Sequence, residues 1–146
     1  MALSADDADD RVEQLIALTE RLTQILTLDA EDFEARRPHA AAGRAEETGR
    51  LANLYRHESL RVRRDGAMIA AAPAARREQL TRATEAMEAV LQRHARALHA
   101  AKTVTEGLVK ALADEAAAQR APKTAYGPGA RMANTANASI TLNRRA

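Results

Sequence analysis

The sequence predicts an all-α protein: an antiparallel three-helix, coiled-coil-like bundle with a long third helix and a disordered C-terminal tail. Alanine supplies 36 of the 146 residues, whereas Leu, Ile, Val and Phe together supply only 25, a composition typical of long helices. Apolar residues recur at helical spacing along most of the chain before Pro122. Pro38, Pro73 and Pro122 divide that part into segments. We therefore expect helices at about 7–37, 39–72 and 74–119, a bundle over 1–120, and a tail over 121–146.

The first segment has the clearest helical start. Ser4 or an aspartate of the run ADDADD can cap it, and the acidic residues lie where the helix dipole favours them. Pro38 ends the segment or forces a turn, and Arg36 and Arg37 lie in its last turn. The apolar residues that follow a spacing of three or four are Val12, Leu15, Leu18, Leu22, Ile25, Leu26 and Phe33.

The second segment has a weaker apolar pattern. Gly43, Gly49 and Gly66 each cost a helix about 1 kcal/mol relative to alanine. The pair Asp65-Gly66 is a candidate break, and Pro73 closes the segment. The residues that form this weaker pattern are Leu51, Leu54, Tyr55, Glu58, Val62, Met68 and Ile69.

The third segment carries the strongest pattern, a 4-3-4-3 alternation that predicts left-handed supercoiling against partner helices. Because this helix is the longest of the three, its C-terminal part is expected to extend past the other two. An apolar seam exposed there indicates either a partner site or a homodimer seam. The seam residues are Leu80, Thr84, Met87, Leu91, His94, Leu98, Ala101, Thr105, Leu108 and Leu112.

The tail differs from the rest in composition and charge. Residues 121–146 hold four basic side chains and no acidic one, whereas residues 1–120 hold 18 basic and 20 acidic side chains. Low hydrophobicity predicts disorder for such a segment. The stretch SITLN, with Ile140 and Leu142 on one side, could add as a strand to a partner's sheet.

Several classes of function are disfavoured. The chain has no cysteine, and His39, His57, His94 and His99 do not have metal-site spacing, so no metal or cofactor is expected. Its serines lie in no nucleophile elbow, which argues against an enzyme. Few aromatic residues and a net acidic body argue against nucleic acid as a partner. Without a signal peptide or a long apolar run, we expect a cytoplasmic protein that does not insert into the membrane.

Three stretches resemble the FlgN-type flagellar export chaperones in their alphaproteobacterial-like form. They are LIALTERLTQILTLDAEDFEARRP, GRLANLYRHE and ALHAAKTVTEGLVKALADEAAAQRAPKTAYGPGA, with SITLNRRA at the end. The resemblance implies a chaperone of type III secretion that binds hook–filament junction (hook-associated) proteins. It would prevent their premature assembly and deliver them to the cytoplasmic domain of the flagellar export gate. The alternative from composition and periodicity is a self-associating structural or regulatory coiled-coil protein.

The resemblance also implies where the partners bind. A tyrosine of the C-terminal region takes part in gate docking, and Tyr126, followed by Gly127 and Gly129, matches it here. The substrate-binding surface belongs to the helical part. We place it on the seam of the third helix at Leu98, Leu108, Val109 and Leu112.

Overall fold

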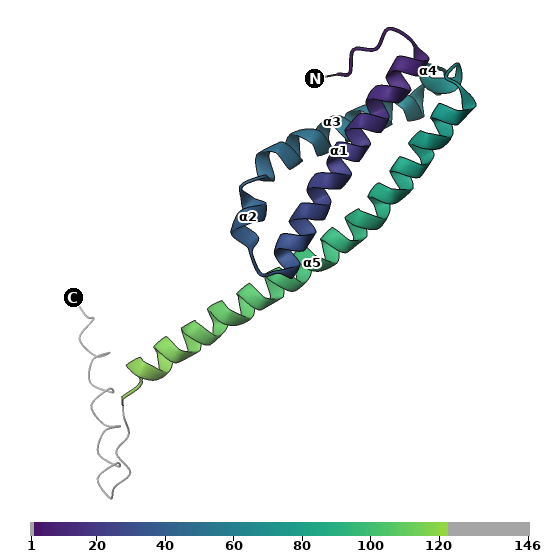
Figure 1. The fold of residues 1–146 in the computed structure, drawn as a ribbon. Helices are drawn as coiled ribbons and strands as arrows, with labels where there is room; N and C mark the ends of the chain where they lie inside the picture. The colour runs from purple at the N-terminus through teal and green to yellow at the C-terminus, as the bar shows by residue number, and fades with distance from the viewer. Residues whose placement is uncertain (1, 123–146) are drawn as a thin grey trace, which may run out of the picture. The chain divides into compact units, whose positions relative to one another are not determined.

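The computed structural model describes residues 2–122, and the chain divides into two units, Met1–Glu106 and Gly107–Ala146. The described residues form five helices and no strand, which confirms the all-α prediction (Figure 1). The helices are α1 (Ala8–Glu34), α2 (Pro38–Ala42), α3 (Ala45–Arg64), α4 (Ala67–Ala70) and α5 (Ala74–Arg120).

The first helix, α1, is the centre of the first unit. Asp7 is its N-cap and accepts a hydrogen bond from the Asp10 N–H at 2.9 Å, which satisfies one of the free donors of the first turn. The helix contacts α2, α3 and α4, and the first part of α5 runs beside it (Figure 1). Because α1 is covered on several sides, it supplies most of the buried side chains: Val12, Leu15, Ile16, Leu18, Thr19, Leu22, Ile25, Leu26, Asp29, Ala30 and Asp32.

The core of the first unit has two apolar clusters along α1. Near its N-terminus, Val12 and Ile16 pack with Ala72 of the α4–α5 turn. Further along, Leu22 and Leu26 pack with Met87 of α5. The partly buried side chains Ile69, Leu80, Leu51, Tyr55 and Val90 complete the clusters. The core is therefore thin and consists mostly of side chains of α1, as expected for a bundle with few large apolar residues.

The second predicted segment, 39–72, contains three helices rather than one. A break at Gly43 and Arg44 separates α2 from α3, and a break at Asp65 and Gly66 separates α3 from α4. At the second break, the Asp65 carboxylate accepts a hydrogen bond from the Ala67 N–H at 3.1 Å, which favours a turn over continued helix. Pro38 occupies the first turn of α2, where proline costs no hydrogen bond.

The third predicted helix corresponds to α5, but its seam is buried only in part. Met87 is buried and His94 is half-buried, with its ring edge-on to Phe33 at a centroid distance of 5.6 Å. Leu91 and Leu98, which the heptad pattern places on the seam, are 48% and 45% exposed. Ala97 is buried instead and Val90 is half-buried, so the face that packs on α1 uses the residues one position before Leu98 and Leu91.

The C-terminus of α1 is closed by an arginine in a conformation that favours glycine. Arg36 has a φ of 59°, and its N–H donates to the Phe33 carbonyl at 3.1 Å. The next N–H, of Arg37, donates to the Asp32 carbonyl at 2.7 Å, so the two bonds form a Schellman motif with Arg36 at its left-handed position. A side chain with a Cβ is strained there.

We therefore expect Arg36→Gly to raise the free energy of unfolding by about 0.5–1 kcal/mol, measured by urea denaturation. Arg36→Ala is the matched control, because it removes the same guanidinium but keeps a Cβ in the left-handed region. A gain of equal size in both variants would contradict the backbone explanation.

Candidate functional site

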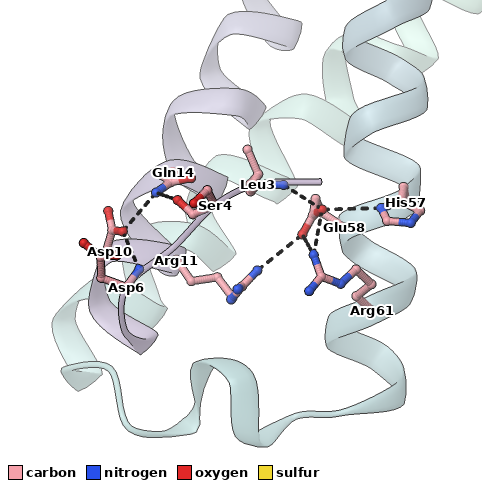
Figure 2. Close-up of polar contacts among 9 residues, drawn as sticks. All are labelled: Leu3, Ser4, Asp6, Asp10, Arg11, Gln14, His57, Glu58 and Arg61. Carbon is pink, nitrogen blue, oxygen red and sulfur yellow. Dashed lines mark hydrogen bonds and ion pairs between the residues drawn. The ribbon is translucent and has the colours of Figure 1, made fainter. Parts of the chain in front are cut away.

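The most buried charged group of the described residues is Glu58, on α3. Its side chain is 0% exposed. Oε1 accepts hydrogen bonds from the Leu3 N–H and from Arg61 Nη1, both at 3.1 Å, and Oε2 lies 3.5 Å from Arg11 Nη1 of α1 (Figure 2). His57 Nδ1 lies 3.4 Å from Oε1. The carboxylate therefore joins α3 to both α1 and the N-terminal segment.

A second network continues along that N-terminal segment. Gln14 Nε2 donates to the Ser4 carbonyl at 2.7 Å and to Asp10 Oδ2 at 3.0 Å (Figure 2). The Asp6 N–H also donates to Asp10 Oδ2, at 3.0 Å. These contacts hold the residues before α1 against its first two turns.

The surroundings of Glu58 keep it ionised. Burial by itself raises the pKa of its carboxyl group, but the hydrogen bonds from Leu3, Arg61 and His57 outweigh burial and hold the pKa below the ordinary 4.5. Both oxygens are engaged, and water does not reach them. A general acid or base needs an accessible proton near neutral pH, so this geometry suits a structural ion cluster rather than catalysis.

A second cluster of buried acids lies near the other end of α1. Arg44, just before α3, donates from Nε to Asp29 Oδ1 at 2.8 Å and also bonds Asp32. The Arg44 hydrogen bond is the main reason that the pKa of Asp32 is lowered. Arg37 adds a second cation, 3.0 Å from Asp32. Both acids are therefore paired, and this cluster is also structural in its geometry.

Among residues 2–122, no group of three or more histidine, aspartate or glutamate side chains could hold a metal ion. His94 packs on Phe33, and His57 lies beside Glu58. None of the helices in the described part is both long and apolar enough to cross a bilayer.

The four residues predicted to bind substrate are all exposed on α5. Leu98, in the first unit, is 45% exposed; in the second unit, Leu108, Val109 and Leu112 are 59%, 60% and 63% exposed. Every residue from 107 to 120 is exposed. Such apolar side chains contribute little to the stability of the fold and are available to a partner. We name Leu108, Val109 and Leu112 the second-unit apolar surface.

Sequence reasoning missed an apolar groove in the first unit, between the end of α1 and α5. It has a volume of about 370 Å³, and we name it the Phe33 groove. The sequence patterns included several of its residues, such as Phe33 and Ala101, but none of them indicated that these two distant segments form one groove. The groove is lined by Phe33, Glu34, Arg36, Pro38, Ala97, Ala100, Ala101, Val104 and Thr105.

The residues predicted to dock at the export gate, Tyr126, Gly127 and Gly129, lie outside the described residues. The same is true of SITLN, residues 139–143.

Comparison with known proteins identifies a full-length relative. The sequence is 55% identical over 149 aligned positions to the flagellar basal-body protein FlbY of Caulobacter vibrioides (strain ATCC 19089 / CIP 103742 / CB 15), and the alignment covers 100% of both chains. The chain belongs to the FlbY family. No family model matches the sequence. No solved structure matches it either. The relative's name does not mention a FlgN-type chaperone, so that resemblance stays a hypothesis.

We expect Glu58→Gln to lower the free energy of unfolding by about 3 kcal/mol at pH 7, because it leaves Arg11 and Arg61, whose side chains are 12% and 34% exposed, without their anion. The folded-state pKa of Glu58 lies below 4.5, so its contribution is present above that pH and is lost as the pH falls through the folded-state value. The difference between the two proteins in urea denaturation should therefore shrink as the pH is lowered below 4.5. Glu46→Gln, at a side chain 86% exposed, is the control and should change little. A difference that is independent of pH would contradict the ion cluster.

Leu22 and Leu112 test the division between core and surface. Leu22 is 4% exposed and Leu112 is 63% exposed. We expect Leu22→Ala to cost about 2–5 kcal/mol of stability and Leu112→Ala to change it by less than about 0.5 kcal/mol. Thermal and urea denaturation followed by circular dichroism measure both. A large loss in Leu112→Ala would mean that this side chain is part of a core.

Proposed function

We propose that this protein is a cytoplasmic export chaperone that binds hook-associated proteins, prevents their premature assembly and delivers them to the flagellar export gate. The observation that carries the proposal is the second-unit apolar surface, where Leu108, Val109 and Leu112 are each at least 59% exposed. The full-length relative, named a flagellar basal-body protein, supports a role in flagellar assembly. The resemblance to FlgN-type chaperones adds the chaperone activity and the partners.

In the proposed mechanism, an amphipathic helix of the hook-associated protein lies along α5 and covers the second-unit apolar surface. Leu108 and Leu112 are four residues apart, so they lie on one side of the helix and can contact the same partner. Burying a half-exposed leucine contributes about 1 kcal/mol. While the helix of the partner is bound to α5, its apolar side is not available to other subunits, so the partner does not assemble prematurely.

The tail has a separate role in this proposal. Tyr126, with Gly127 and Gly129, docks at the cytoplasmic domain of the export gate, an assignment that rests on the resemblance to the FlgN-type chaperones. Because the substrate surface belongs to α5, capture and gate docking use different residues. Substitutions can therefore separate the two steps.

The role is not enzymatic. In the described residues, the buried carboxylates Asp29, Asp32 and Glu58 are each paired with an arginine. This pairing supports the view that they stabilise the fold rather than activate a substrate.

The second candidate is a structural or regulatory coiled-coil protein that self-associates through α5. The same exposed residues favour it, since a second copy could cover them in a homodimer. Sedimentation equilibrium distinguishes the two candidates: a stable dimer that excludes hook-associated proteins would favour self-association.

A binding assay with purified hook-associated proteins tests the proposal. We expect the wild type to bind at least one of them and Leu108→Ser/Leu112→Ser to lower that affinity by about 30-fold, the equivalent of two leucines at about 1 kcal/mol each. Tyr126→Ala should keep the affinity for the hook-associated protein and weaken binding to the purified gate domain.

Leu60→Ser is the matched control, because Leu60 is an exposed leucine, 45% accessible, on a different helix, α3. It should bind as the wild type does. Failure of the wild type to bind any hook-associated protein would refute the chaperone proposal, and unchanged gate binding by Tyr126→Ala would refute the role of the tail.

A further inference from the structure

The Phe33 groove joins an apolar floor to a charged loop within the first unit. Ala97, 8% exposed, and Ala101 lie along its α5 side, and Phe33 and Val104 supply its larger apolar side chains. Alanines at such positions leave room for a second backbone to approach closely. A groove of about 370 Å³ between two helices thus has the shape and lining that receive an apolar helix face.

Some of the charged side chains around the groove form ion pairs within the described residues, and one does not. Arg93 holds Glu34 through two hydrogen bonds, Nε to Oε1 at 2.9 Å and Nη2 to Oε2 at 2.6 Å. Arg37 is paired with Asp32 at 3.0 Å. Arg36 lines the groove and makes no ion pair within residues 2–122. The groove therefore has one cation whose charge nothing in the described chain neutralises.

An arginine is unexpected at position 36, because the backbone there has a conformation that favours glycine. Its φ of 59° lies in the left-handed region, where glycine closes a helix without strain. Strained positions tend to occur where a side chain has a function. The guanidinium at the edge of an apolar groove is the one feature that glycine could not supply.

We propose that the Phe33 groove receives an amphipathic helix of the exported partner, and that Arg36 pairs with an acidic side chain beside the apolar residues of that helix. The proposal rests on the chaperone function above and adds the chemistry by which the partner is recognised. Carboxylate is the natural complement, because guanidinium binds it through two parallel hydrogen bonds. The neighbouring apolar lining reduces water around the pair and strengthens it.

The test compares four variants in a titration against purified hook-associated proteins. We expect Arg36→Glu to lower affinity about ten-fold, since it places a negative charge against the partner's acid. Arg36→Gly should lower affinity about two- to five-fold, although it relieves the backbone strain. Arg36→Lys, which keeps the charge, should stay within about two-fold of the wild type. Arg82→Glu, at an exposed arginine elsewhere on α5, is the charge-reversal control and should bind as the wild type does.

Salt dependence provides a second readout that a structural defect would not reproduce. Raising the salt concentration should weaken wild-type binding more than that of Arg36→Gly, because only the wild type forms the ion pair. A benzophenone photo-cross-linker at Ala100, an exposed residue of the groove, should link to the hook-associated protein, whereas one at Gln92 should not.

The outcomes separate the two proposals. If the wild type binds a hook-associated protein but Arg36→Glu binds equally well and Ala100 gives no cross-link, the groove proposal is wrong and the chaperone function stands. If the wild type binds none of these proteins, both proposals fail. Loss of affinity in Arg36→Glu equal to that in Arg82→Glu would also overturn the groove proposal, since it would reflect overall charge.

Discussion

The pairing of buried carboxylates with arginines at the two ends of the α1–α3 contact is the interaction on which the first unit depends. The only buried side chain of α3 is a glutamate, Glu58, so apolar packing alone does not attach this helix to α1. Arg11 and Arg61 bind Glu58 at one end, and Arg44 binds two aspartates of α1 at the other. The ion clusters stabilise the contact between α3 and α1. They also fix the orientation of α3, because guanidinium–carboxylate hydrogen bonds have a defined geometry.

This arrangement follows from the scarcity of large apolar residues. Within residues 2–122, the buried large apolar side chains all belong to α1 except Met87 of α5, and α3 has none. On α5 the apolar residues of the first unit are shared between the α1 contact and solvent, and those of the second unit are all exposed. The protein thus uses charged groups inside the first unit and presents leucine and valine on the surface of α5.

Helical periodicity was sufficient to predict the all-α class of the described residues and the long C-terminal helix. It could not predict which side of α5 faces α1, because Val90 and Ala97, one position before Leu91 and Leu98, are apolar as well. It was also insufficient for the break at Gly43 and Arg44, whereas the pair Asp65-Gly66 did indicate the break between α3 and α4. The Phe33 groove and the role of Glu58 depend on residues far apart in the chain, and a single sequence gives no signal for such pairs.

The hydrogen bond from the Leu3 N–H to Glu58 affects how easily a protease can cleave the segment before α1. Proteases attack chain ends that are loose, and the ends of most domains are loose unless they are tied down. Here the third residue is bonded to a buried carboxylate, and Ser4 and Asp6 are held by Gln14 and Asp10. Cleavage by a protease within residues 3–6 must first detach this segment from Glu58, Gln14 and Asp10. The contacts that join the segment to α1 and α3 therefore also protect it from proteolysis.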